Sequence, residues 1–369
     1  MRYSKYLALW ALLLTLILVA CGGETGAGTP AAEADPAADP EAEAVADPEA
    51  SSEDEPLTGS LVIYSGRAES LIGPIIEQFE AETGLDVAVR YGSTGEIAAT
   101  LLEEGENSPA DIFYAQDPGG LGAVQAAGLL APLPADVLSI VPPGFEHEGG
   151  EWVGISGRAR VIVYNTDTLT EADLPEDIAD FTDPSWNGRI GWPPTNASFQ
   201  TMVTGMRQLW GEAETRAWLE GIQANNPTVY ENNTAVVAAV AAGEVEVGFV
   251  NHYYLYRFLA SEGESFPARN YFLPGGGPGS LIMVSGAGIL KTAPNAENAE
   301  RFLEFMLSPE AQQYFATQTF EYPMIDGITL PDLLPPLAEL TPMAVSINLS
   351  DLSDLQGTVA LLQELAILP

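Results

Sequence analysis

The sequence predicts an α/β protein built on a mostly parallel sheet and divided into two lobes. Short apolar runs alternate with segments whose apolar residues recur at helical spacing, and this alternation is typical of parallel α/β folds. A chain of 369 residues is too long for one ordinary hydrophobic core, which favours two domains or a domain with a leader. Apolar residues make up 46% of the chain, a normal share for a folded protein.

The start of the chain is expected to be an export signal and not part of the fold. Two basic residues precede a continuous apolar run at residues 6–20, and this run is short for a membrane span of about 20 residues. The run ends in Leu-Val-Ala-Cys-Gly around Cys21, which resembles the bacterial lipobox. Residues 1–20 are therefore predicted to be a lipoprotein signal peptide that leaves Cys21 lipidated. The alternative is a plain secretory signal with an incidental cysteine.

The next segment, residues 21–57, is predicted to be a disordered acidic tether. From residue 24 it consists mostly of Ala, Pro, Glu, Asp, Gly and Ser, with no basic and no aromatic residue. Such a segment cannot bury enough apolar surface to offset the entropy of ordering, and its like charges keep it extended.

The charge balance excludes several classes of function. Thirteen Lys and Arg stand against 52 Asp and Glu, which gives a formal net charge of -39. A nucleic-acid binder needs clustered basic residues on phosphates, so that class is excluded, as is docking on an anionic membrane through a basic patch. A single cysteine permits neither an internal disulfide nor a cysteine-based zinc or iron–sulfur site.

The folded part is expected to begin with a buried strand at residues 61–64. The strands expected after it lie at residues 85–89, 110–114, 161–164, 245–250 and 282–289. The helical patterns cover residues 72–79, 97–102, 121–130, 201–210, 213–221, 234–242 and 297–307. The strand at 245–250 delivers Asn-His-Tyr-Tyr at its carboxyl end, the end of a strand at which open α/β sheets bind ligands.

Tyr253 and Tyr254 are the candidate metal ligands of the sequence. A phenol ionises near pH 10, so it becomes a good ligand only where a strongly charged cation displaces its proton. Ferric iron is such a cation, and phenolate oxygen is a hard donor that suits it. Taken alone, however, a pair of tyrosines is equally typical of a core or of a sugar-stacking surface.

Four segments carry a resemblance to a known family. They read Ser-Pro-Ala-Asp-Ile-Phe-Tyr at 108–114, Ser-Gly-Arg-Ala-Arg-Val-Ile-Val-Tyr at 156–164, Asn-Gly-Arg-Ile-Gly at 187–191 and Asn-His-Tyr-Tyr at 251–254. With these segments in order, the chain from about Ser60 to Pro323 resembles the periplasmic ferric-iron-binding proteins of bacterial ABC importers. The resemblance implies a two-lobed periplasmic-binding-protein fold with hinge strands between the lobes and the ligand in the cleft between them. It also implies that Tyr253 and Tyr254 hold iron as phenolates.

The resemblance further implies an arrangement in space and a set of partners. Residues 58–157 and 285–334 would form the N-lobe, and residues 158–284 and 335–369 the C-lobe. The protein would be a monomeric, extracytoplasmic component of an ABC importer that docks on a permease in the cytoplasmic membrane. It would lie in the periplasm or on the outer face of that membrane, tethered through Cys21, and would perform no catalysis.

The match departs from the family at its other ligand positions. Relatives often supply a His after the first strand, where this chain has Ala68 and Glu69, and others supply a Glu where this chain has Gln116. Because Glu69 and Gln116 occupy these positions, they are candidate metal ligands in this chain. A further group of relatives has a third cleft tyrosine shortly after Gly191, but residues 196–199 of this chain include no tyrosine. His252 neighbours the tyrosine pair but is expected to face away from it.

Two phenolates leave much of an octahedral ferric shell open, and a synergistic anion such as carbonate, phosphate or citrate could complete it with water. The candidate anion-binding residues implied by the resemblance are Arg158, Asn196, Ser198 and Asn233. Arg158 could instead form an ion pair between the lobes.

The sequence leaves other functions open. The same fold could bind a polyamine, a sugar or an oxyanion, in which case the missing iron ligands would be the informative feature. A secreted enzyme is disfavoured because the chain has no Gly-x-Ser-x-Gly elbow, no His-Glu-x-x-His motif and only two histidines. A pair of catalytic carboxylates, as in a glycosidase, is not excluded by a sequence so rich in acids.

Overall fold

The computed structural model describes residues 58–369, which fall in a single compact unit. The predicted signal peptide at 1–20, the lipidated Cys21 and the tether at 21–57 lie outside the described residues. Across residues 58–369, none of the helices combines the length and the apolar character that crossing a membrane requires.

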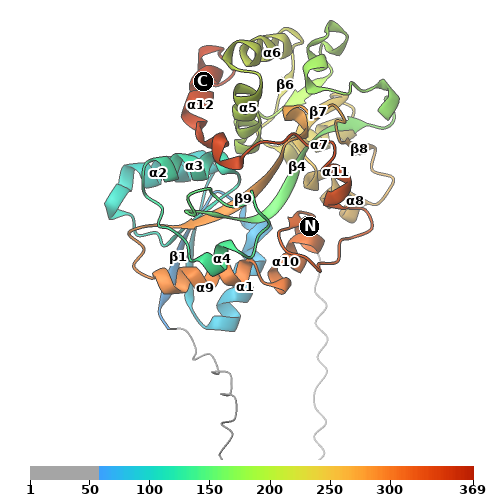
Figure 1. Cartoon of the computed structure of the whole chain (residues 1–369). Helices are drawn as coiled ribbons and strands as arrows, with labels where there is room; N and C mark the ends of the chain where they lie inside the picture. The colour runs from blue at the N-terminus through green and yellow to red at the C-terminus, as the bar shows by residue number, and fades with distance from the viewer. Residues whose placement is uncertain (1–57) are drawn as a thin grey trace, which may run out of the picture. The chain divides into compact units, whose positions relative to one another are not determined.

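Ten strands form one mixed sheet in the described part of the chain (Figure 1). They are β1 (Ser60–Ser65), β2 (Asp86–Tyr91), β3 (Ile112–Ala115), β4 (Val153–Asn165), β5 (Ile190–Trp192), β6 (Thr228–Val229), β7 (Val247–Asn251), β8 (Ala268–Tyr271), β9 (Ile282–Ile289) and β10 (Tyr322–Pro323). The order across the sheet is β2-β1-β3-β9-β4-β7-β5-β6, and β8 and β10 both pair with β4.

The expectation of a mostly parallel sheet is wrong for its centre. The pairs β1–β2, β1–β3, β5–β6 and β5–β7 are parallel, but β9 runs antiparallel to β3 and β4, and β4 runs antiparallel to β7, β8 and β10. The long strand β4, buried along its whole length, carries the chain from one parallel group to the other, and β9 carries it back. Strand–helix alternation predicts the parallel groups, but it contains no information about two strands that pass between them.

Helices cover both ends of this sheet. They are α1 (Glu69–Thr83), α2 (Thr94–Glu104), α3 (Pro118–Ala126), α4 (Ala135–Leu138), α5 (Ala197–Leu209), α6 (Glu212–Ala224), α7 (Asn233–Ala241), α8 (Tyr253–Glu262), α9 (Ala296–Met306), α10 (Pro309–Tyr314), α11 (Leu337–Leu340) and α12 (Leu355–Glu364). Short helical turns are η1 (Gly105–Asn107), η2 (Glu171–Asp173), η3 (Ile178–Thr182), η4 (Pro184–Trp186), η5 (Pro278–Ser280), the π-helical η6 (Phe315–Thr319) and η7 (Leu349–Ser353). Figure 1 shows α5, α6 and α12 together at one end and α1, α9 and α10 at the other.

Local sequence explains where these helices begin and end. The side chain of Ser93 accepts from the backbone N–H of Glu96, and the Glu96 carboxylate accepts from the backbone N–H of Ser93, so α2 starts at a capping box. Asp117 caps α3, with Pro118 in the first turn. Helix α1 ends at Thr83 and is capped by Gly84, which has a left-handed φ of 73°. The expected helix at 97–102 is thus confirmed as part of α2.

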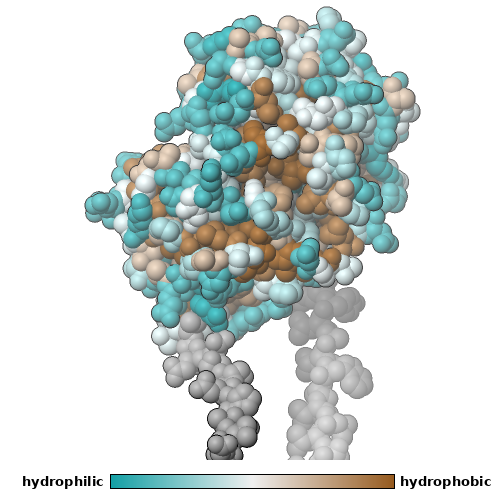
Figure 2. All heavy atoms as spheres, in the orientation of Figure 1, coloured by the Kyte–Doolittle hydropathy of each residue, from teal (hydrophilic) through white to brown (hydrophobic). Residues whose placement is uncertain are grey.

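Two clusters of buried apolar side chains form the core. The second cluster holds most of the buried apolar residues between Ile162 and Leu273, including Phe181 and Phe249, whose rings meet edge to face. Val236 and Tyr253 nevertheless pack in the first cluster. The predicted lobe boundaries stay a prediction. Figure 2 shows apolar residues reaching the surface in the middle of the face drawn, within a mostly hydrophilic rim.

Candidate functional site

The tyrosine pair lies where β7 gives way directly to α8. Strand β7 ends at Asn251, and Tyr253 and Tyr254 are the first two residues of the helix. Their rings stack at 4.2 Å between centroids with an interplanar angle of 29°. Tyr253 is buried and Tyr254 is half-buried. The turn from strand to helix therefore brings two neighbouring phenols to the same side of the chain, which an extended strand would not do.

His252 is not turned away from the pair, because its ring meets the Tyr253 ring edge to face at 5.7 Å between centroids. Its Nδ1 accepts from the backbone N–H of Ala159 at 3.1 Å, and its Nε2 donates to the carbonyl oxygen of Phe320 at 2.9 Å. Burial lowers the pKa of His252 to about 4, so the ring is neutral at physiological pH. Both ring nitrogens are occupied by backbone, and none is left for a metal ion.

Gln116 contacts the pair through a hydrogen bond. It follows β3 directly, is 6% exposed, and its Nε2 donates to the hydroxyl oxygen of Tyr253 at 3.0 Å. Its Oε1 accepts from Nη1 of Arg67 at 3.4 Å. The side chain is thus in the place where the sequence predicts a ligand, but it presents its nitrogen to the phenol.

An ion-pair cluster of Arg67, Glu321 and Arg158 is buried beside Gln116. Arg67 donates to both carboxylate oxygens of Glu321, at 2.8 and 2.7 Å, and Arg158 donates to Oε1 of Glu321 at 2.9 Å. The hydroxyls of Ser156 and Thr319 each donate to Oε2 of Glu321 at 3.1 Å. The carboxylate is therefore fully hydrogen-bonded although it has no access to solvent.

The segment that delivers Glu321 is locally strained. It leaves the π-helical η6 through Phe320, a non-glycine residue with a left-handed φ of 58°. Single π-helical turns and such backbone outliers concentrate at functional sites, where surrounding contacts hold them in place. Here the contacts are the cluster on Glu321 and the hydrogen bond from His252 to the Phe320 carbonyl.

Burial and charge act in opposite directions on these groups. Burial would raise the pKa of Glu321, but Arg67 and Arg158 outweigh it and hold the pKa at about 2. Burial would lower the pKa of Arg67, but Glu321 outweighs it and raises that pKa. Burial and the neighbouring Tyr254 raise the pKa of the Tyr253 phenol, against the lowering effect of the two arginines. Tyr253 is therefore protonated until a cation displaces the proton.

Arg158 forms an ion pair, the alternative that the sequence left open, and its anion-binding role stays a prediction. It pairs with Glu321, and its guanidinium carbon lies 5.9 Å from the centre of the Tyr253 ring. Its Nε and Nη1 are buried without a hydrogen-bond partner. Such orphaned donors are costly, and they are the groups that an anion beside Tyr253 would satisfy.

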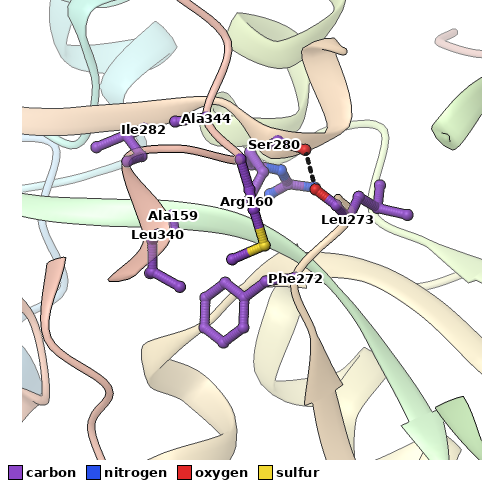
Figure 3. Close-up of a pocket in the computed structure, with 9 residues that line it drawn as sticks. Ala159, Arg160, Phe272, Leu273, Ser280, Ile282, Leu340 and Ala344 are labelled. Carbon is purple, nitrogen blue, oxygen red and sulfur yellow. Dashed lines mark hydrogen bonds between the residues drawn. The ribbon is translucent and has the colours of Figure 1, made fainter. Parts of the chain in front are cut away.

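Arg160 is a buried cation without a carboxylate partner. Its Nη1 donates to Oδ1 of Asn251 at 3.0 Å, while its Nε and Nη2 have no partner. Burial lowers the pKa of Arg160 to about 9, and charge on Tyr253 or Tyr254 would act to raise it. Arg160 lies beside a cavity of about 10 Å³, which is enclosed by β4, by α11 and by the loop that contains Leu273 and Ser280. Figure 3 shows these residues and the hydrogen bond from Ser280 to Leu273. A cavity of this size holds about one water molecule.

The loop before α5 gathers the other predicted anion-binding residues. Oδ1 of Asn196 accepts from the backbone N–H groups of Ser198 and Phe199 and from Nδ2 of Asn233 at 3.2 Å. The Ser198 hydroxyl accepts from Nδ2 of Asn251 at 3.1 Å. Asn233 is fully buried, and its Oδ1 has no partner. Three of the four predicted anion-binding residues thus form one cluster, joined to Arg160 through Asn251.

Glu69 is not part of either cluster. It is an exposed acid in the first turn of α1, where the helix dipole favours it. Burial raises the pKa of Tyr91 to about 12, and the charge of Glu69 adds to this effect. Among residues 58–369, no group of three or more His, Cys, Asp or Glu side chains is arranged to hold a metal ion. The phenols are therefore the donors that distinguish this site.

The sequence prediction does not include four residues of the site, which are Arg67, Arg160, Asn251 and Glu321. Arg67 lies two residues after the end of β1, and a basic residue so close to a buried strand is a usable signal in a chain with few of them. Glu321 gives no such signal, because it is one of 52 acidic residues and lies 254 positions from Arg67.

Comparison with known proteins places the chain among binding proteins. Residues 107–345 match the family model described as bacterial extracellular solute-binding protein. The chain is 34% identical to the Fe(3+)-binding periplasmic protein of Serratia marcescens, over 76% of this chain and 83% of that protein. It is 31% identical to the major ferric iron-binding protein of Neisseria meningitidis serogroup A, over 84% of this chain and 93% of that protein.

Solved structures agree with the sequence relatives. Iron-bound HitA from Pseudomonas aeruginosa superposes with a TM-score of 0.79 at 35% identity, covering 83% of this chain and 99% of that one. A Trichodesmium protein in complex with iron and citrate gives a TM-score of 0.69 at 30% identity over 83% of this chain and 99% of that one. These likenesses confirm the predicted two-lobed α/β fold. The relatives are binding proteins and not enzymes, which confirms that prediction too.

Proposed function

Because the chain belongs to the family of bacterial extracellular solute-binding proteins, we propose that its solute is ferric iron, held by Tyr253 and Tyr254 together with a synergistic anion. The observation that supports this most strongly is the stacked phenol pair at the start of α8. The ferric-iron-binding relatives from Serratia and Neisseria support the choice of metal.

The charge around the pair favours phenolate. Three buried arginines lie near the phenols, and one paired carboxylate, Glu321, offsets one of them. The other buried acid near them, Asp117, accepts from the Thr201 hydroxyl, and burial raises its pKa. The three arginines therefore outnumber the two buried acids, and this excess of positive charge favours phenolates. A ferric ion adds three further positive charges, so positive charge stays in excess even with both phenols ionised.

This uncompensated charge is the reason for a multivalent oxyanion in the site. The orphaned nitrogens of Arg158 and the cluster of Asn196, Ser198 and Asn233 supply donors for it. Carbonate, phosphate and citrate all fit this description. The Trichodesmium structure, which holds iron and citrate, supports citrate as the first anion to test.

The remaining candidate ligands have a weaker case. Gln116 presents its amide nitrogen to Tyr253, and Glu69 is exposed on α1. In our proposal, water or the anion therefore completes the iron shell. Glu69 is a less favoured candidate for the same position. The excess of buried arginines disfavours a polyamine, whereas a free oxyanion without iron is the competing solute.

The cellular setting is part of the same proposal. The protein would be exported as a monomeric lipoprotein held through Cys21, and would deliver iron to a permease of an ABC importer in the cytoplasmic membrane. The relatives named as periplasmic support an extracytoplasmic place for the chain.

Titration with ferric citrate tests this function. Binding is expected to produce a visible tyrosinate-to-iron charge-transfer band, and Y253F and Y254F are each expected to weaken both the band and the affinity. Y230F is the matched control, because Tyr230 is half-buried and its hydroxyl donates to Glu244 outside the described cluster. Iron affinity equal to wild type in both Y253F and Y254F would remove the pair from the iron shell, and binding of citrate without iron would favour the competing solute.

A further inference from the structure

A continuous chain of buried hydrogen bonds leads from Glu321 to the Tyr253 phenol. Glu321 holds Arg67 by two parallel bonds of 2.8 and 2.7 Å, and Arg67 donates to Oε1 of Gln116 at 3.4 Å. Gln116 in turn donates to the Tyr253 hydroxyl oxygen at 3.0 Å. Gln116 is 6% exposed and the other three residues are fully buried, so solvent does not compete with these bonds.

The chemistry of Arg67 fixes which way the Gln116 amide points. A guanidinium carries only N–H donors, so the atom that faces it must be the amide oxygen. The amide NH₂ group is then directed at Tyr253. The two bonds to Glu321 prevent the guanidinium from turning away, because this planar paired geometry needs both nitrogens in place.

Gln116 is placed to donate a hydrogen bond to the Tyr253 oxygen, and such a bond is strengthened when the acceptor carries negative charge. We propose that Arg67, held by Glu321, is a positioning residue for metal binding, and that it locks Gln116 as a hydrogen-bond donor to the metal-bound oxygen of Tyr253. This inference rests on the proposed iron site. Gln116 then acts on iron through Tyr253 and is not itself a ligand, which leaves a coordination position open to the anion or to water.

Arg67→Lys is the variant that separates positioning from charge. A lysine keeps the positive charge opposite Glu321, so the buried carboxylate stays paired, but a single ammonium cannot make two parallel bonds and also reach Gln116. The iron complex of R67K is expected to absorb at longer wavelength, because the phenolate loses a hydrogen bond and becomes a better electron donor. The affinity for ferric citrate is expected to fall about tenfold, the loss typical of one hydrogen bond to a charged group.

Gln116→Leu removes the donor and leaves the Arg67–Glu321 pair intact. It is expected to reproduce the wavelength shift of R67K, and it keeps the test valid if R67K does not fold. The double variant R67K/Q116L is expected to shift no further than Q116L alone, because both changes break the same chain of bonds. R90K is the matched control, since Arg90 is exposed and pairs with Glu104 on the surface.

The outcomes distinguish this inference from the function on which it rests. If wild-type protein gives no charge-transfer band with ferric citrate, the proposed function fails. If wild type gives the band and Q116L leaves its wavelength unchanged, the inference is wrong while the iron site stands. Additive shifts in the double variant would also overturn it, because Arg67 would then act independently of Gln116.

Discussion

Replacing Glu321 with glutamine tests the cluster that supports the phenol pair. The Glu321 carboxylate accepts from two arginines and two hydroxyls in a site without solvent. Its pKa is about 2 in the folded protein, against an ordinary value of 4.5. At 1.36 kcal/mol per pKa unit, this difference contributes about 3 kcal/mol to folding at pH 7. Removing one partner of a buried ion pair typically costs about 3–5 kcal/mol, which agrees with that figure.

The sign of the pKa change determines how this loss depends on pH. Because the folded pKa is lowered, the contribution of Glu321 is fully present above pH 4.5 and is lost as the pH falls from 4.5 towards 2. The free energy of unfolding of E321Q should therefore lie about 3 kcal/mol below that of wild type at neutral pH. The two proteins should converge as the medium becomes strongly acidic, where wild-type Glu321 is itself protonated.

Urea unfolding followed by tryptophan fluorescence at a series of pH values measures this difference. Glu212→Gln is the control, because Glu212 is 61% exposed and pairs with Arg207 at the surface, where an ion pair contributes at most about 1 kcal/mol. Equal stability of E321Q and wild type at pH 7 would refute the reasoning. A large difference that stays constant down to the acidic end would show that Glu321 acts through packing and not through its charge.

Two further substitutions test other parts of the account. Arg160→Met removes an unpaired buried cation, so the free energy of unfolding should rise by about 1–3 kcal/mol while the affinity for ferric citrate falls. A lower free energy of unfolding with an unchanged affinity for ferric citrate would contradict the description of Arg160 as an unpaired buried cation close to the iron site. Gly122→Ala places a Cβ against Ser353, only 2.6 Å from its Cα, and should cost about 1–3 kcal/mol in urea unfolding. The control Gly95→Ala, with no neighbouring atom within 4 Å of the added Cβ, should be neutral or slightly stabilising, and equal effects of the two changes would show that α3 and η7 do not pack as described.

Much of the fold could be predicted from local sequence. The capping box at Ser93 and Glu96 marks the start of α2, and the apolar run at 282–289 coincides with β9. These signals are local, because caps and periodicity depend on residues that are neighbours in the chain. The antiparallel centre of the sheet was missed because strand direction there depends on how β4 and β9 cross between two parallel groups.

The part of the site that lies in a single segment of the chain could be predicted from the sequence. Tyr253 and Tyr254 are adjacent in sequence, and a strand followed by a helix is enough to bring their phenols together. Arg67, Gln116 and Glu321 come from three segments that meet only in the folded protein, across separations of 49 and 254 positions. No single sequence states which of its many acids meets a given arginine, so the cluster could be found only from the structure.

Resonance Raman spectra of the ferric complex, excited within its charge-transfer band, test the central claim most directly. Wild-type protein loaded with ferric citrate should show enhanced tyrosinate ring vibrations. Each single phenylalanine variant of the pair should weaken them, and Y253F/Y254F should abolish them. Iron bound without any enhanced tyrosinate vibration in the wild-type protein would contradict the account, since the metal would then be held by other donors.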